Sequence, residues 1–236
     1  MDVNKIYCMD CLEGMAGLVS DSVDLIVTSP PYNIGIDYGD FNDNQDFSVY
    51  KDWLLRVLRE CFRVIKDRGI VAFVIGNQRN SGLPHYFYFL LKEVGFKVIK
   101  EIFWYKGLYY IQGESIFVCS KSGDYNCYYR KTDGFYSNGQ FSTIWEMRYK
   151  TGESRDDLGH DAFFVKQIPR NFVLINTIEG DLVLDCFMGS GTTAVACKEL
   201  GRNFIGFDIS RDYCDVAIRR LGQSNLSTFF VKDGVV

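Results

Sequence analysis

The last third of the chain contains the feature that most constrains its fold. An apolar run, Leu182 to Cys186, leads into Phe187-Met-Gly-Ser-Gly191, and Thr192 to Leu200 then has the pattern of a helix. A second apolar run, Phe204 to Phe207, follows and ends at Asp208. A strand, a glycine turn, a helix and another strand in this order are typical of open α/β sheets. Ligands bind such sheets beyond the carboxyl ends of the strands, so the glycine turn is a candidate binding loop.

The same alternation continues through most of the 236 residues. Apolar spacing predicts strands at 3–7, 23–28, 70–75, 96–105 and 115–120, and helices at 47–66, 83–94, 164–177 and 211–221. We therefore predict an α/β fold with an open, mostly parallel sheet and helices on both of its faces. Residues 1–120 and 159–236 together would form one domain.

Residues 121–158 break this alternation. They are rich in Tyr, Gly, Lys and Arg and lack a long apolar period, which favours a small insertion into the domain. Basic and aromatic side chains together are typical of nucleic-acid contacts, so this segment is the candidate for target recognition. The candidate contacts within it are Lys121, Arg130, Lys131, Arg148 and Lys150. The alternative is a solvated β excursion with tyrosines in the core.

Composition excludes several classes of protein. Hydrophobic residues make up 47% of the chain and charged residues 24%, as in ordinary globular domains. No apolar run reaches the length of a membrane span and no signal-peptide pattern is present, so we expect a cytoplasmic protein without membrane contacts. The net charge of −4 argues against a large nucleic-acid footprint but allows a local basic patch.

The eight cysteines do not form a metal-binding pattern. Cys8 and Cys11 make a Cys-x-x-Cys pair, but neither a second such pair nor a histidine cluster accompanies it. We predict free thiols and no metal site.

The glycine turn has the features of a cofactor loop. Its glycines allow positive φ and close approach of a ligand to the backbone, and no lysine follows them as it would in a P-loop. Asp208, at the tip of the next strand, suits a ribose diol. The alternative is a simple helix-capping turn with a solvated aspartate.

A second motif, Ser29-Pro30-Pro31-Tyr32, follows the apolar run 23–28. Two prolines fix φ and remove two N–H donors, which leaves a rigid turn. The Ser29 hydroxyl and the Pro30 carbonyl can accept both hydrogens of an amine, and Tyr32 can stack on a flat ring. The alternative is a strand-ending turn with a core tyrosine. Residues 33–46 follow, and their composition predicts a mobile loop that closes over a bound base.

Together these segments resemble the DNA amino-methyltransferases, which modify adenine N6 or cytosine N4. The Ser29–Tyr32 turn resembles their catalytic motif, and Asp185 to Thr193 resembles their cofactor loop. The catalytic motif comes first along the chain, an order similar to that of the β class of the family. The resemblance does not include residues 121–158. It implies a Rossmann-like class I methyltransferase fold, S-adenosylmethionine as cofactor, double-stranded DNA as partner and a possible homodimer.

The resemblance also implies roles for individual residues. The catalytic residues would be Ser29, Pro30, Pro31 and Tyr32. The cofactor-binding residues would be Asp10, Asp185, Phe187, Gly189, Ser190, Gly191, Thr192 and Asp208. Two places depart from the family pattern: Cys186 stands where Pro is common, and residues 160–164 lack two prolines of a neighbouring pattern.

The base and the substrate class leave alternatives open. Serine in the first motif position favours cytosine N4 over adenine N6 within this family. Cytosine C5 methylation needs a Cys after Pro, and none of the four prolines precedes a cysteine. An RNA or protein-glutamine N-methyltransferase and an inactive DNA-binding subunit are the competing interpretations.

Overall fold

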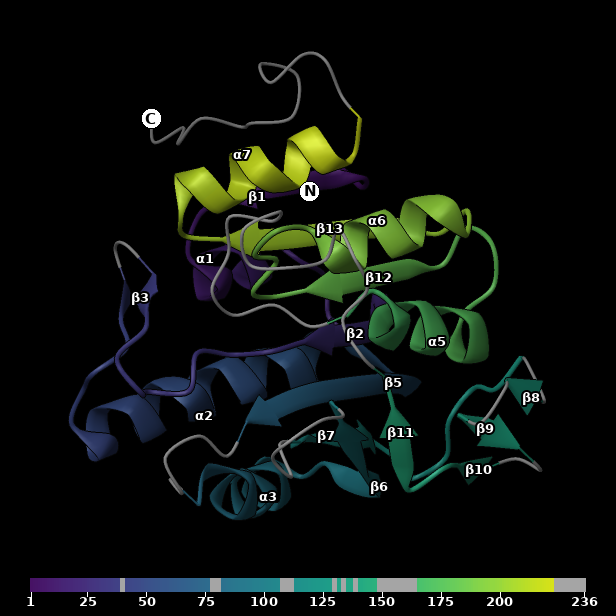
Figure 1. The fold of residues 1–236 in the computed structure, drawn as a ribbon, viewed down its shortest axis with the longest axis horizontal. Coiled ribbons are helices and arrows are strands. Elements are labelled where there is room, and N and C mark those ends of the chain that lie inside the picture. The colour runs from purple at the N-terminus through teal and green to yellow at the C-terminus, as the bar shows by residue number, and fades with distance from the viewer. Residues whose placement is uncertain are drawn as a thin grey trace.

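A mixed sheet forms the centre of the protein in the computed structural model, which describes residues 1–38, 41–76, 82–106, 113–128, 131–132, 135–137, 140–147 and 165–222. Within these residues eight strands pair in the order β1-β13-β12-β2-β5-β7-β6-β11 (Figure 1). Their bounds are β1 Lys5–Cys8, β2 Val23–Thr28, β5 Ile65–Gly76, β6 Lys97–Tyr105, β7 Gly113–Ser120, β11 Ile144–Glu146, β12 Leu182–Asp185 and β13 Asn203–Asp208. β7 runs antiparallel to β5 and β6, and the other neighbouring pairs are parallel. The predicted open, mostly parallel sheet is confirmed.

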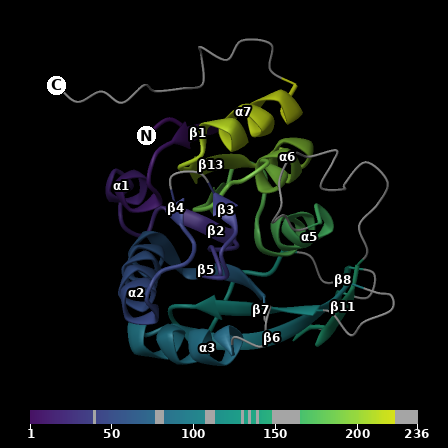
Figure 2. The ribbon, with the colours of Figure 1, turned by 60° about the vertical axis from the view of Figure 1, so that its left-hand side comes forward.

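Helices cover both faces of this sheet (Figure 2). One face packs against α1 Cys11–Ala16, α2 Phe47–Val64 and α3 Leu83–Val94, and the other against α5 Gln167–Asn176, α6 Thr192–Glu199 and α7 Arg211–Arg220. The strands alternate accordingly: Val71 and Phe73 of β5 point to the first group, and Ile70 and Ala72 point to the second. No helix in the described ranges is long and apolar enough to cross a membrane.

Local signals explain where the helices begin and end. Asp46 caps α2 by accepting the backbone N–H of Ser48 at 2.8 Å. α3 has a proline in its first turn and ends at Gly95, whose φ of 111° stops the helix. The predicted bounds 23–28 and 83–94 are therefore reproduced, while β5 extends beyond the predicted 70–75 at both ends.

The order in which strands are added to the sheet reverses between β2 and β12, two parallel strands at the middle of the sheet. From β2 the chain passes through α2 to β5 on one side, and from β12 it passes through α6 to β13 on the other. Such a reversal opens a crevice at the carboxyl ends of the two strands, where α/β proteins bind their ligands.

The segment 121–158 is tied to the main core. Part of it forms a small sheet of β8 Lys131–Thr132, β9 Tyr136–Ser137 and β10 Gln140–Phe141, and β11 joins the edge of the central sheet. Tyr136, Phe141 and Trp145 are buried in the same cluster as Phe172 of α5. A further hairpin, β3 Asp37–Tyr38 and β4 Phe41–Asn42, follows the Pro-Pro turn. The division of the chain into a catalytic domain and an insertion stays a prediction.

Candidate functional site

The two predicted motifs lie side by side at the carboxyl edge of the sheet. β12 pairs with β2 through Leu184 opposite Ile26, so the two strands end at the same level. The glycine loop leaves β12 there, and the Ser-Pro-Pro-Tyr turn leaves β2. Thr28 Oγ1 donates a hydrogen bond of 2.7 Å to Asp185 Oδ1, which joins the last residues of the two strands directly.

Asp185 is buried beneath both loops. Its carboxylate accepts the hydroxyls of Thr28 and Thr193, at 2.7 and 2.6 Å, and the N–H of Phe187 at 3.1 Å. Burial raises the pKa of this carboxyl to about 7, although the three donors act in the opposite direction. The resemblance implies a cofactor contact for Asp185. The structure places its carboxylate where it orders the loop and the turn from below.

The glycines of the loop adopt conformations that favour glycine. Gly189 and Gly191 have φ of 51° and 82°. A Cβ on Gly191 would lie 2.7 Å from the Cβ of Ala217 on α7, so a side chain there would push the loop and the helix apart. The loop therefore packs backbone against helix on one side.

Ser190 and Thr192, both predicted to bind the cofactor, are buried against α7. Arg220 Nη1 donates to the Ser190 carbonyl at 2.6 Å, to its hydroxyl at 2.9 Å and to the Thr192 hydroxyl at 3.2 Å. The hydroxyls of Ser190 and Thr192 thus point toward α7. Arg220 was missed by the sequence analysis because its only signal is a basic residue in the last turn of a helix.

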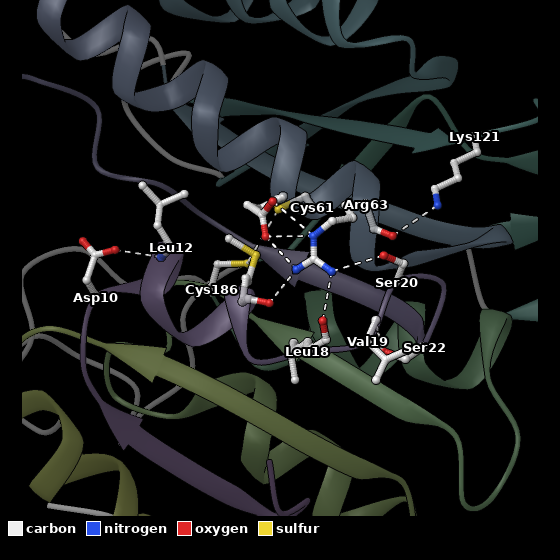
Figure 3. A network of polar contacts seen from close by, with 12 residues as sticks. Asp10, Leu12, Leu18, Val19, Ser20, Ser22, Cys61, Arg63, Lys121 and Cys186 are labelled. Atoms are coloured by element: carbon white, nitrogen blue, oxygen red, sulfur yellow. Dashed lines mark hydrogen bonds and ion pairs between the residues drawn. The ribbon is translucent and has the colours of Figure 1, made fainter. Parts of the chain in front are cut away.

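Two carboxylates lie at or just after the carboxyl ends of neighbouring strands. Asp208, at the end of β13, accepts the N–H of Gly189 at 2.7 Å and that of Ser210 at 2.9 Å, and burial raises its pKa to about 6. β1 pairs with β13, and Asp10 follows β1 and caps α1 by accepting the N–H of Leu12 at 2.7 Å (Figure 3). Each carboxylate oxygen retains a lone pair that can accept a hydroxyl.

The Ser29–Tyr32 turn presents its oxygens differently. Ser29 Oγ lies 2.8 Å from the Tyr32 hydroxyl and donates to the Val74 carbonyl at 3.0 Å. The Pro31 carbonyl accepts the Tyr50 hydroxyl at 2.7 Å, which fixes the turn on α2. The Pro30 carbonyl accepts no hydrogen bond within the described residues.

Tyr32 contacts an ion pair that the sequence analysis did not identify. Its hydroxyl, which has one proton to donate, lies 3.2 Å from Val74 O and 3.3 Å from Glu114 Oε2, and Lys106 pairs with the other carboxylate oxygen. Tyr32 is 8% exposed, so its ring is packed into the core on the side of α1, α2 and α3 rather than standing free. A sequence signal existed: one charge follows the predicted strand 96–105 and another precedes 115–120.

The segment after the turn is organised around Asp43, a buried residue. The Asp43 carboxylate accepts the N–H groups of Asn33, Ile34 and Ile36 at 2.7, 3.1 and 3.0 Å. Hydrogen bonds to Asp43 therefore hold part of the segment that was predicted to be a mobile loop. Whether it closes over a base stays a prediction.

Aromatic rings connect this segment to the cofactor loop. The ring centroids of Phe41 and Trp53 of α2 are 4.9 Å apart, and those of Trp53 and Phe187 are 5.7 Å apart. Phe187, predicted to bind the cofactor, thus takes part in an aromatic chain that is half-buried at the carboxyl edge.

Cys186 stands at a position where proline is common in the family, and its sulfur packs in the core. Its Sγ lies 3.7 Å from Cys61 Sγ and 3.6 Å from Met15 Sδ, between α1 and α2 (Figure 3). The Cys61 contact and burial raise the pKa of this thiol, so it stays protonated. No three His, Cys, Asp or Glu side chains of the described ranges are grouped so as to hold a metal.

The predicted DNA contacts are only partly placed. Lys121 lies at the end of β7, which is antiparallel to its neighbours, and pairs with Asp21 at the amino edge of the sheet. Its Nζ also lies 3.4 Å from the Arg63 carbonyl (Figure 3). It is therefore on the opposite edge from the two motifs. Lys131 lies in β8, but its side chain is not described, and Arg130, Arg148, Lys150 and residues 160–164 lie outside the described residues.

Known proteins match both the sequence and the fold. A family model of N6 and N4 methyltransferases, described as DNA methylase, matches residues 23–219. The chain belongs to this DNA methylase family. It is 30% identical to the type II methyltransferase M.HpaI of Haemophilus parainfluenzae over 92% of this chain and 74% of that protein.

Solved structures share the architecture of this methylase. The cytosine-N4-specific PvuII DNA methyltransferase has a TM-score of 0.75 at 20% identity, covering 94% of this chain and 87% of that one, which concerns the fold alone. TTHA0409 of Thermus thermophilus, solved with S-adenosyl-L-methionine, has a TM-score of 0.71 at 25% identity over 92% and 93% of the two chains. The predicted class of fold and the predicted family are confirmed.

Proposed function

We propose that this DNA methylase transfers a methyl group from S-adenosylmethionine to the exocyclic amine of a base flipped out of double-stranded DNA. The observation that carries the proposal is the hydrogen bond between Thr28 and Asp185, because it fixes the amine-accepting turn beside the glycine loop. A methyl transfer needs its two reactants aligned within a fraction of an ångström, and such alignment can supply several kcal/mol.

The cofactor side has a donor and acceptor set that fits S-adenosylmethionine. Gly189 and Gly191 keep side chains away from the loop, so a ligand can approach its backbone. Asp208 and Asp10 carry acceptors for hydroxyl groups at the ends of adjacent strands, and we propose that they bind the ribose and the region of the adenine. Phe187 and the loop backbone would contact the remainder. The bound cofactor would supply an electrophilic methyl group on a sulfonium and leave as the neutral thioether, S-adenosylhomocysteine, while the methylated amine releases one proton to water.

The turn has the acceptors that an amine requires. Ser29 directs its hydroxyl proton to Val74, which leaves the oxygen lone pairs for a base N–H, and the Pro30 carbonyl is a second acceptor. Two acceptors favour a more tetrahedral nitrogen and stabilise the positive charge that develops on it. Because the target atom is buried in a duplex, the base must leave the helix to reach the turn.

We propose cytosine N4 as the substrate atom in preference to adenine N6, on the basis of serine at the first motif position. For DNA contacts we propose the segment 121–158, with Arg130, Lys131, Arg148 and Lys150. Lys121 is left out because of its place at the amino edge. The reaction takes place where the host DNA lies, which we propose is the cytoplasm.

The test is direct incubation of the protein with labelled S-adenosylmethionine and mixed-sequence duplex DNA, followed by digestion and mass analysis of the nucleosides. N4-methylcytosine supports the proposal in full, and N6-methyladenine corrects the base alone. Label in RNA or protein, and none in DNA, refutes the DNA substrate. Bound cofactor without any transfer points to an inactive DNA-binding subunit.

A further inference from the structure

An ion pair lies behind Tyr32, and the proposed chemistry does not yet use it. Glu114 is 7% exposed in β7 and pairs with Lys106, which follows β6. The Lys106 ammonium also lies 4.4 Å from the centre of the Trp104 ring, a cation–π contact. Removing two charges from water is costly, so their presence against the turn needs an explanation beyond stability.

The second carboxylate oxygen of Glu114 points at the turn. Oε2 accepts the Tyr32 hydroxyl at 3.3 Å, and the same hydroxyl lies 2.8 Å from Ser29 Oγ. The Val74 carbonyl accepts from Ser29 at 3.0 Å and from Tyr32 at 3.2 Å. Two hydroxyl protons are thus shared among several acceptors, and their distribution decides what Ser29 can offer to a ligand.

An ionised carboxylate is a stronger acceptor than a carbonyl or a hydroxyl. With Glu114 ionised, the Tyr32 proton points to Glu114, and the Ser29 proton lies toward the Tyr32 and Val74 oxygens at 2.8 and 3.0 Å. Both lone pairs of Ser29 are then available. Without that charge, Tyr32 donates to Ser29 at 2.8 Å and occupies a lone pair that the amine requires.

We infer that Glu114, held in place by Lys106, is a positioning residue that takes up the Tyr32 proton and so keeps Ser29 free to accept the base amine. The inference rests on the proposed function, because the amine is its ligand. Glu114 acts through Tyr32 and touches neither base nor cofactor in this scheme.

The first variant is Glu114→Gln, whose amide can donate to Tyr32 and turn the Tyr32 proton toward Ser29. We expect kcat to fall by about 10- to 100-fold, as when one transition-state hydrogen bond is lost, with KM for DNA and Kd for the cofactor within about twofold. The matched control is Glu101→Gln, an exposed carboxylate on the neighbouring β6 that accepts the Ser115 hydroxyl. Its kcat should stay at the wild-type value.

A double-mutant cycle separates this role from a structural one. If Glu114 acts through the Tyr32 hydroxyl, Glu114→Gln adds no further loss of kcat in a Tyr32→Phe background. Fully additive losses, or a wild-type kcat in the Glu114→Gln variant, overturn the inference. Should that variant unfold, Lys106→Met tests the same pair from its other member, and an unchanged kcat there overturns it equally.

A measurement without substrate separates the inference from the proposed function. The ¹³Cζ resonance of Tyr32, assigned by its loss in Tyr32→Phe, reports the hydrogen bonding of the hydroxyl. We expect it to move in Glu114→Gln and to stay in place in Glu101→Gln. If the wild type methylates DNA but this resonance does not move, the inference alone fails. If the resonance moves but no DNA is methylated, the proposed function fails and the role of the pair toward an amine fails with it.

Discussion

The glycine loop and the Ser-Pro-Pro-Tyr turn leave neighbouring strands at one edge of the sheet. Their polar side chains, however, make different kinds of contacts. In the glycine loop the side chains turn inward, since Ser190 and Thr192 bind Arg220. In the turn, Ser29 donates to Val74 and keeps acceptor capacity, and the Pro30 carbonyl accepts no hydrogen bond from the described residues. Under the proposed function, the loop would bind the cofactor through its backbone, and the turn would bind the amine through individual oxygens.

The largest effect should come from the turn. Ser29→Ala removes one of two acceptors for the amine, so we expect turnover to fall by about 10- to 1000-fold, or about 1.4–4 kcal/mol in the barrier. Cofactor affinity, measured by calorimetry, should stay within about twofold because Ser29 does not belong to the glycine loop. A wild-type turnover in this variant would show that the turn is not the amine site.

The reverse pattern is expected at Asp208. Asp208→Ala removes the acceptor of Gly189 N–H and the proposed ribose acceptor, so the Kd for S-adenosylmethionine should rise by about 10- to 100-fold. Asp212→Ala, an exposed position in the first turn of α7, is the matched control and should bind normally. Equal affinities for the two variants in a calorimetric titration would remove Asp208 from the cofactor site.

The titration of Asp185, the buried carboxyl beneath both loops, should affect how the free energy of unfolding depends on pH. The pKa of Asp185, about 7 in the folded protein, lies above the ordinary 3.8, so between these values the folded state binds more protons than the unfolded chain. The free energy of unfolding therefore falls as the pH rises through that window, by up to ~1.4 kcal/mol per pH unit for one group. Asp185→Asn should remove that contribution, as seen in denaturant titrations at several pH values. Parallel curves for wild type and variant would contradict the raised pKa.

The smallest effect is expected at the amino edge of the sheet. Lys121→Ala breaks an ion pair with Asp21 far from both loops, so DNA affinity should change by less than about twofold. Arg148→Ala, in the segment that we propose contacts DNA, should weaken binding and reduce the salt dependence by about one phosphate contact. A large effect of Lys121→Ala in a salt titration would place DNA on the edge that we regard as structural.

Much of the fold was predictable because the local spacing of apolar residues distinguishes its helices from its strands. β2 and α3 have the predicted bounds, since a proline pair and a glycine end them. The short α1 and the two-residue strands were missed, because a few residues do not establish a period. The predicted glycine loop and turn lie together because parallel strands bring their carboxyl ends to one edge.

The partners of the site residues were not predictable. Arg220 and Glu114 reach Ser190 and Tyr32 through tertiary packing, and no spacing along the chain encodes those contacts. Lys121 shows another limit: composition groups it with the basic residues of 121–158, but the antiparallel direction of β7 places it at the amino edge of the sheet, away from the two motifs. Direction within a sheet depends on pairing, which a single strand's sequence does not reveal.

The contact between Thr28 and Asp185 has a consequence for accuracy. These residues are 157 positions apart, and small displacements along such a path would ordinarily accumulate between donor and acceptor. The pairing of β12 with β2 and this 2.7 Å contact bypass that path. Under the proposed function, the loop and the turn would therefore hold their two ligands relative to the same point of the sheet.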